Sequence, residues 1–111
     1  MLKQGPALDR VFHALSDPSR RSIVERLSGG STSVSELAEP LPMSLPAVLQ
    51  HIQVLEDSGL VRSEKIGRVR TCSIDVAALQ PVERWIEQRR AGWDRRLDRL
   101  GAYLADEATN R

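Results

Sequence analysis

Apolar residues recur at three- and four-residue steps in the first part of the chain, which is the spacing of amphipathic helices. The first predicted helix runs from about Ala7 to Leu15. The second begins at Asp17-Pro18, because aspartate caps a helix and proline suits its first position. Gly29-Gly30 ends it, since glycine commonly follows the last helical turn. The pattern therefore predicts two consecutive helices before residue 30.

Two further helices follow, and each has its own start signal. Ser33-Val34-Ser35-Glu36 is a capping box, so a short third helix starts there, and Pro40-Leu41-Pro42 closes it. Ser44 then caps a fourth helix, which Ser58-Gly59 ends. The inner face of this fourth helix carries Val48, Ile52 and Leu55. Two helices joined by a tight turn predict a helix-turn-helix.

A hairpin is predicted directly after the fourth helix. Leu60 to Ile66 and Val69 to Ile74 are rich in β-branched residues and flank Gly67-Arg68. Glycine at the first of two turn positions suits a type II′ turn. Asp75 is expected to cap a short turn through Leu79. A helix-turn-helix followed by such a wing is built to touch duplex DNA, with one helix in the major groove and the wing on the backbone.

The last predicted helix, from Pro81 to about Asp106, is long for so small a domain. Its apolar stripe covers about 23 residues, or roughly 35 Å at the helical rise. Pairing with a second copy would bury both tryptophans, whereas the alternative is packing onto the first two helices alone. The stripe consists of Val82, Trp85, Ile86, Arg89, Trp93, Leu97, Leu100 and Leu104.

The predicted fold class is therefore mainly α, a winged helix-turn-helix with the order αααα-ββ-α. We expect a single domain over residues 1–111, with a DNA-binding core at 7–75, the wing at 60–75 and a dimerisation helix at 81–106. A chain of 111 residues has room for one modest core.

Charge is distributed unevenly. The net charge is only +1, but Arg62, Lys65, Arg68 and Arg70 face one acid, Glu64, across nine residues. The excess positive charge therefore lies on the wing. The sequence has one cysteine, Cys72, which excludes an intrachain disulfide and is expected to be a half-buried strand residue. No apolar signal core or membrane span is visible, so we expect a cytoplasmic protein without a membrane partner.

Catalysis is not expected. The sequence shows no Ser/His/Asp grouping and no phosphate-cradling glycine loop, and one cysteine with two distant histidines does not supply a metal centre. We predict neither a cofactor nor a bound metal. A small-molecule pocket near Trp85 and Trp93 is an alternative to a purely packed role for these residues, and the sequence identifies no effector.

Two motifs resemble the ArsR/SmtB family of bacterial repressors. They are Phe12-His13-Ala14-Leu15-Ser16-Asp17-Pro18-Ser19-Arg20-Arg21 and Met43-Ser44-Leu45-Pro46-Ala47-Val48, the latter continued by His51, Val54-Leu55-Glu56 and Gly59-Leu60-Val61. The match covers roughly residues 8 to 104. The resemblance implies a winged-helix homodimer, with the first and fifth helices forming the dimer face. It also implies binding to an imperfect palindrome at promoters, usually as a repressor and often of the protein's own operon.

This chain departs from the family pattern in two places. Metal-sensing members usually carry a Cys-x-Cys pair in the third helix or a set of His, Asp and Glu ligands in the fifth. Here the third helix has no cysteine and the fifth has neither histidine nor cysteine, so we predict a non-metal branch. Relatives often place Lys or Arg at the positions of Gln50 and Gln53. Glutamine reads adenine but neutralises no phosphate, so a gentle salt dependence is expected.

Each predicted DNA contact has a plainer alternative. Ser44 is a cap that can also bind phosphate, and Leu45 either meets a thymine methyl or joins the core. Gln50 and His51 are expected opposite Val48 and Leu55, and the family places a histidine here near DNA. One of Arg20 and Arg21 is expected to reach phosphate while the other pairs with an acid. The predicted DNA contacts are Ser44, Leu45, Ala47, Gln50, His51, Gln53, Lys65, Arg68 and Arg70.

The predicted dimer contacts come from the first and last helices. They are Leu8, Val11, Phe12, Val82, Trp85, Ile86, Trp93, Leu97, Leu100 and Leu104. The function expected is a sequence-specific, DNA-binding transcriptional regulator. The alternative is a winged-helix module that binds a protein, which the apolar Leu45 and Leu49 on the fourth helix would favour.

Overall fold

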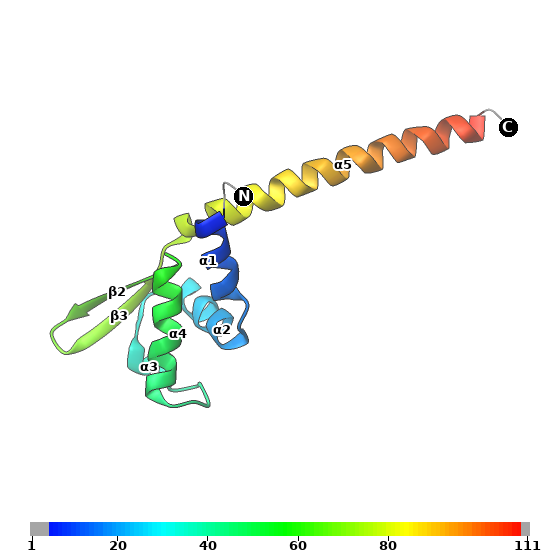
Figure 1. The fold of residues 1–111 in the computed structure, drawn as a ribbon. Helices are drawn as coiled ribbons and strands as arrows, with labels where there is room; N and C mark the ends of the chain where they lie inside the picture. Colours follow the sequence, from blue (N-terminus) through cyan, green and yellow to red (C-terminus); the bar gives the residue numbers. More distant parts are fainter. Residues whose placement is uncertain (1–4, 110–111) are drawn as a thin grey trace. The chain divides into compact units, whose positions relative to one another are not determined.

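A computed structural model describes residues 5–109 of the chain (Figure 1). The chain divides into two compact units, Met1–Pro81 and Val82–Arg111. The predicted order of helices and strands is confirmed, with one short strand added. The elements are α1 (Gly5–Leu15), α2 (Pro18–Ser28), β1 (Thr32–Ser33), α3 (Val34–Ala38), α4 (Leu45–Asp57), β2 (Val61–Ile66), β3 (Val69–Ile74), a 3₁₀ turn (Val76–Leu79) and α5 (Gln80–Thr109).

The helix starts are set by the residues that the sequence indicates. The Asp17 carboxylate accepts hydrogen bonds from the backbone N–H groups of Ser19 (2.8 Å) and Arg20 (3.1 Å), which caps α2. The Ser33 hydroxyl accepts a hydrogen bond from the N–H of Glu36, which is one half of a capping box. In the other half the Glu36 carboxylate would accept from the N–H of Ser33, but here it accepts from the Thr32 hydroxyl. Asp75 caps the 3₁₀ turn through the N–H of Ala77, as predicted.

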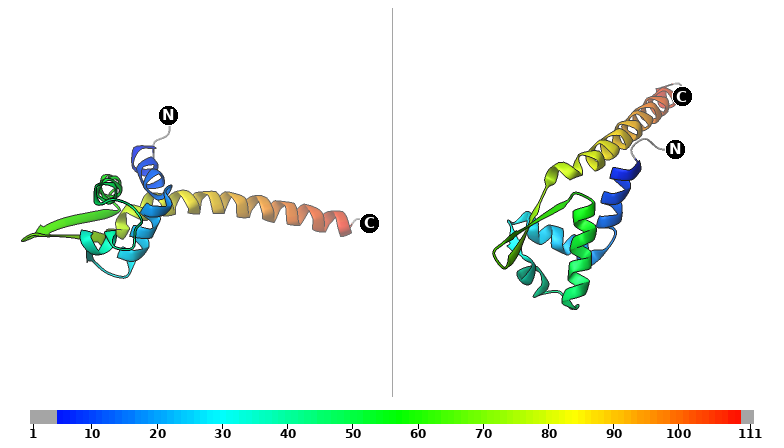
Figure 2. Two further views of the ribbon diagram at one scale, coloured as in Figure 1. Left: turned by 90° about the horizontal axis from the view of Figure 1, so that it is seen from below. Right: turned by 60° about the vertical axis from the view of Figure 1, so that its left-hand side comes forward.

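The core of the first unit forms around α4, which contacts α1, α2, α3 and β2. Val48, Ile52 and Leu55 are fully buried, as the periodicity predicts. They belong to the same core as Ile23, Leu27, Leu37 and Leu60. Figure 2 shows the hairpin of β2 and β3 projecting beyond these helices. The helices thus form a rigid base that presents one face of α4 beside the wing.

The wing is part of a three-stranded antiparallel sheet with the order β1-β3-β2. Ile66 pairs with Val69, so Gly67-Arg68 is a two-residue turn, as predicted. Gly67 has φ +65° and no non-glycine residue among those described has positive φ, which fits type II′ and excludes type I′. The strand β1 was not predicted, because its two residues, the second of which also caps α3, are too few to show an alternating pattern.

The remaining boundaries shift only slightly. Helix α1 begins at Gly5 rather than about Ala7, and α5 extends from Gln80 to Thr109 rather than from 81 to about 106. Cys72 has no exposed surface, so it is fully buried rather than half-buried.

Candidate nucleic-acid interface

The first turn of α4 presents both polar and apolar side chains. Ser44 is exposed and its hydroxyl accepts from the N–H of Ala47 at 3.4 Å, so it caps the helix as predicted. Leu45 is 52% exposed, which excludes the alternative that it is part of the core. Ala47 is half-buried. The N-terminal end of α4 therefore offers a hydroxyl and the apolar side chains of Leu45 and Pro46 to a ligand.

The two glutamines of α4 are both exposed. Gln53 donates through Nε2 to Asp57 Oδ1 at 2.9 Å, one turn further along the helix, so its amide is partly occupied. Gln50 lies away from the buried residues of α4, as predicted. Of the two, Gln50 is the better placed to read a base, because a bidentate contact with adenine needs the whole amide group.

The expectation for His51 was wrong in one respect. It is half-buried and does not lie opposite Val48 and Leu55. A residue three after one core position and four before another shares their side of a helix. Its Nδ1 is 3.2 Å from Nη1 of Arg20.

The contact with Arg20 determines which nitrogen of His51 carries the proton. A guanidinium only donates hydrogen bonds, so Nδ1 of His51 must accept, and the neutral imidazole then has its proton on Nε2. Within residues 5–109, Nε2 makes no hydrogen bond to protein. His51 therefore keeps an N–H donor for a ligand.

Arg20 and Arg21 both donate to the end of α1, so the expected pairing of one of them with an acid is wrong, and the expected phosphate contact of the other stays a prediction. Arg20, only 9% exposed, donates to the carbonyls of Ala14 (2.8 Å) and His13 (3.0 Å). Arg21 donates to the Leu15 carbonyl at 2.7 Å. The last carbonyls of a helix lack partners within it and carry partial negative charge, which these cations offset. Neither arginine forms an ion pair with an acid in the described part of the chain.

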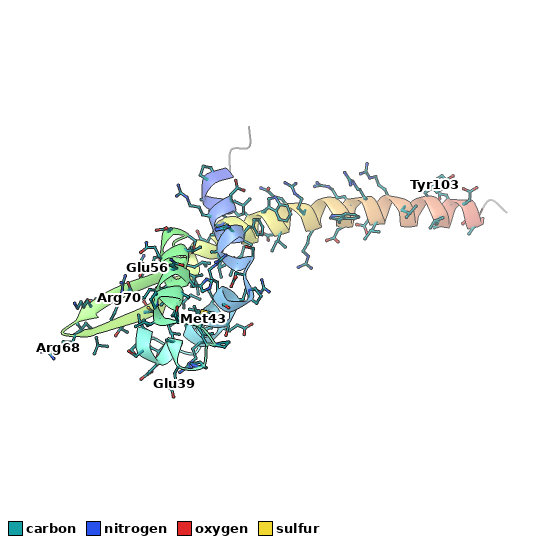
Figure 3. All side chains as sticks on the ribbon, turned by 60° about the horizontal axis from the view of Figure 1, so that its bottom comes forward. Glu39, Met43, Glu56, Arg68, Arg70 and Tyr103 are labelled. Carbon is teal, nitrogen blue, oxygen red and sulfur yellow. The ribbon has the colours of Figure 1, made fainter. Side chains whose placement is uncertain are left out.

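The positive charge of the wing is smaller than the local sequence suggests. Arg62 pairs with Asp75 at 2.7 Å, and Arg70 pairs with Glu56 at 3.1 Å. Both acids lie outside residues 62–70, and no local signal in the sequence marks a partner that folding brings close. Among residues 5–109, Lys65 forms no ion pair, and neither does Arg68 at the wing tip (Figure 3).

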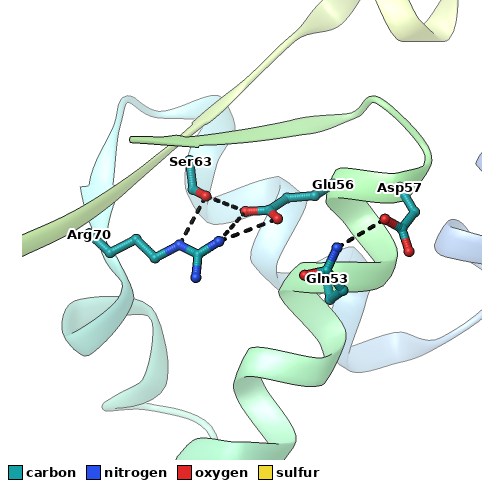
Figure 4. A network of polar contacts seen from close by, with 5 residues as sticks. All are labelled: Gln53, Glu56, Asp57, Ser63 and Arg70. Carbon is teal, nitrogen blue, oxygen red and sulfur yellow. Dashed lines mark hydrogen bonds and ion pairs between the residues drawn. The ribbon is translucent and has the colours of Figure 1, made fainter. Parts of the chain in front are cut away.

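Arg70 belongs to a small polar network at the junction of wing and helix (Figure 4). Its Nε donates to the Ser63 hydroxyl at 2.9 Å, and Nη2 reaches both carboxylate oxygens of Glu56, at 3.1 and 3.4 Å. The Ser63 hydroxyl also donates to Glu56. Arg70 is thus engaged by protein, and its predicted DNA contact stays a prediction.

The predicted dimer residues separate into buried and exposed groups. Leu8, Val11 and Val82 are buried in the single chain, and their dimer contacts stay predictions. Phe12 is 40% exposed on α1, and Trp85 is half-buried on α5, where the Arg89 guanidinium lies 5.2 Å from its ring centre. The exposed large apolar residues of α5 are Ile86, Trp93, Leu97, Leu100, Tyr103 and Leu104.

Other binding chemistry is sparse. Among the described residues, no three or more His, Cys, Asp and Glu side chains are grouped to hold a metal ion. Burial raises the pKa of the Cys72 thiol above its usual value, and the nearby Glu56 carboxylate acts in the same direction. The described helices include none long and apolar enough to cross a membrane.

Comparison with known proteins gives a consistent result. A helix-turn-helix domain model matches residues 15–64. The transcriptional regulator Rv2034 of Mycobacterium tuberculosis is 46% identical over 71 residues, which are 64% of this chain and 66% of that protein, just under two thirds of its length. The transcriptional repressor SdpR of Bacillus subtilis is 29% identical over 79 residues, covering 71% of this chain and 88% of the relative.

Solved structures extend the match to most of the chain. A crystal structure of an ArsR family transcriptional regulator is 45% identical, with a TM-score of 0.79, and the match covers 85% of this chain and 97% of that one. A homodimeric winged helix-turn-helix DNA-binding domain from Mycobacterium bovis, a possible ArsR-family regulator, is 26% identical with a TM-score of 0.59 and coverage of 84% and 83%. On its fold, its motifs and these relatives, the chain belongs to the ArsR family of winged-helix transcriptional regulators.

Proposed function

We propose that this regulator binds an imperfect palindrome at promoters as a homodimer and represses transcription, including that of its own gene. The observation that carries the proposal is the combination of the exposed amides of Gln50 and Gln53 on α4 with two cations on the adjacent wing, Lys65 and Arg68, which form no ion pair among the described residues. Repression is supported by the similarity to a protein named a transcriptional repressor, and dimerisation by a homodimeric structural neighbour.

In this proposal α4 enters the major groove and reads bases. Gln50 hydrogen-bonds an adenine edge, and the exposed Leu45 meets a thymine methyl. Ser44 binds a phosphate at the start of the helix, while His51 donates from Nε2 to an acceptor on the DNA. Gln53 contributes at the outer edge of the same surface.

Few phosphates are neutralised in this arrangement. Arg62 and Arg70 are paired with acids, which leaves Lys65 and Arg68 as the wing cations able to displace counterions. Each neutralised phosphate contributes a slope of about −0.9 to the dependence of log affinity on log salt. Binding is therefore expected to weaken gently with salt, and specificity to depend mainly on base contacts.

The second copy covers the exposed apolar face of α5. Ile86, Trp93, Leu97, Leu100 and Leu104 follow one another at steps of seven, four, three and four residues, which is the spacing of a helix–helix seam. An exposed apolar row of this kind marks a candidate protein–protein contact surface. A two-fold dimer presents two copies of α4 to successive major grooves, which a palindrome matches. Phe12 stays a predicted contact from α1.

Fluorescence anisotropy tests DNA binding and metal dependence together. Purified protein is titrated onto its own upstream DNA and onto scrambled DNA of equal length, with and without a chelator. We expect tight binding to the upstream DNA alone, unchanged by the chelator. Equal binding to both DNAs would contradict specific recognition at this promoter, and a change of binding in either direction on adding the chelator would contradict the non-metal branch.

Light scattering tests the dimer. Leu97→Glu places a charge in the seam and is expected to yield monomers at micromolar concentration. Gln88→Glu is the matched control, because residue 88 lies on the opposite side of the helix and is exposed. If Leu97→Glu stayed as dimeric as the control, the α5 face would not be the interface.

A further inference from the structure

The outer half of the wing has little support from the rest of the first unit. All residues from 64 to 70 are exposed, whereas Val61 and Cys72 at the base of the hairpin are buried. The tip, with Arg68, therefore projects from a firm base as a two-stranded ribbon (Figure 3). An isolated two-stranded hairpin is marginally stable in water, so its direction depends on any contact it makes with the helices.

Arg70 makes such a contact, two residues from Arg68. Its guanidinium binds Glu56 near the C-terminal end of α4 and Ser63 on the partner strand (Figure 4). The Glu56 side chain is only 18% exposed, compared with 45% for Arg70. A partly buried carboxylate is less screened by solvent than a surface one, and a planar guanidinium held at two nitrogens has a defined orientation.

We propose that Glu56 is a positioning residue for DNA binding. Through Arg70 it holds the wing at a fixed angle to α4, so that Arg68 meets the DNA backbone or minor groove while α4 occupies the major groove. This inference rests on the proposed function, because it assumes that α4 and the wing engage the same duplex. Glu56 itself need not touch DNA.

Whether removing the charge of Glu56 weakens or tightens DNA binding separates a positioning role from a simple charge effect. An acid on a DNA-binding surface repels phosphates, and Glu56 also competes with phosphate for Arg70. On electrostatic grounds alone, removing its charge would tighten binding and steepen the salt dependence. If Glu56 positions the wing, removing its charge weakens binding although the protein becomes more positive.

Glu56→Gln provides this test, and Asp57→Asn is its matched control. Asp57 is the adjacent acid on α4, is exposed, and accepts a hydrogen bond from Gln53 rather than from the wing. We expect Glu56→Gln to weaken binding to the specific DNA about threefold to fivefold, the upper part of the scale measured for solvent-accessible ion pairs. Asp57→Asn should leave affinity unchanged or tighten it by at most about twofold. Equal or tighter binding by Glu56→Gln would overturn the proposal.

Adding Arg68→Ala to each variant gives a readout that a general loss of stability would not produce. In the wild type and in Asp57→Asn, Arg68→Ala should weaken binding by the same factor. In Glu56→Gln the factor should shrink towards one, because a displaced tip has already lost its contact. Full additivity in all three backgrounds would refute positioning.

Two controls keep the outcomes distinct. Thermal unfolding is followed for every variant, and Arg70→Lys, which retains the charge but not the two-point geometry, should show the same loss as Glu56→Gln. Undiminished binding by Arg70→Lys would count against the proposal. If the wild type itself shows no preference for the upstream DNA over scrambled DNA, the proposed function at this promoter fails. If it binds and Glu56→Gln matches Asp57→Asn, only the positioning role fails.

Discussion

Arg20 should contribute more to stability than other charged residues in this chain, and Arg20→Met tests this. The guanidinium is 9% exposed and makes three hydrogen bonds, two to the last turn of α1 and one to His51 on α4. Methionine retains most of the apolar stem but removes every donor. The carbonyl of Ala14, in a buried hydrogen bond, and that of His13, in a partly buried one, then lose the cation that binds them.

The expected loss can be estimated from these contacts. A hydrogen bond to a charged group contributes about 1.5–3 kcal/mol, and a buried polar group without a partner costs a similar amount. The three bonds share one guanidinium and water can reach part of the helix end, so the contributions do not add fully. We expect the free energy of unfolding to fall by about 3 kcal/mol, and the melting temperature by roughly 10–20 °C for a domain of this size.

Urea unfolding followed by far-ultraviolet circular dichroism measures the loss at one fixed protein concentration, since dimerisation makes stability depend on concentration. Arg21→Met is the matched control. Arg21 is the next residue and also donates to an α1 carbonyl, but its hydrogen bond is exposed. Arg21→Met should lower the free energy of unfolding by less than about 1 kcal/mol. Equal losses from the two substitutions would refute the argument that burial makes Arg20 important.

Four further predictions concern single residues. Gln50→Ala should cost about 1–3 kcal/mol on specific DNA and little on scrambled DNA, by anisotropy; equal losses would remove it as a base reader. Arg68→Ala should reduce the salt slope by about two per dimer, about one for each copy, and Arg62→Ala by less because Arg62 is paired with Asp75; a larger change from Arg62→Ala would contradict the charge assignment. Hydrogen bonds from the N–H groups of Arg20 and Ser19 lower the pKa of Asp17, so its stabilisation is present at neutral pH and lost as pH falls below its ordinary value of 3.8. The stability difference between wild type and Asp17→Asn should therefore shrink on acidification in urea titrations, and a constant difference would refute it. Cys72, fully buried and with a raised pKa, should react with a thiol reagent far more slowly in the folded protein than in urea, and equal rates would show that it is accessible.

Helices and turns were predictable because their signals are local. The caps at Asp17, Ser33 and Ser44 each act within three residues, and the glycine at 67 acts within a two-residue turn. The side of α4 that carries His51 also follows from helical geometry, so its burial was predictable from the spacing. Its hydrogen bond to Arg20 was not, because the two residues are 31 positions apart.

By itself, then, the sequence determined the order of elements, the buried face of α4 and the position of the wing turn, since each depends on interactions between near neighbours in the chain. Only the tertiary structure decided which charges remain available to a ligand. Arg70 meets Glu56 across 14 positions, and Arg62 meets Asp75, which directly follows the next strand along the chain. Ion pairing depends on distance in space, and folding brings together acids and bases that the local pattern keeps apart.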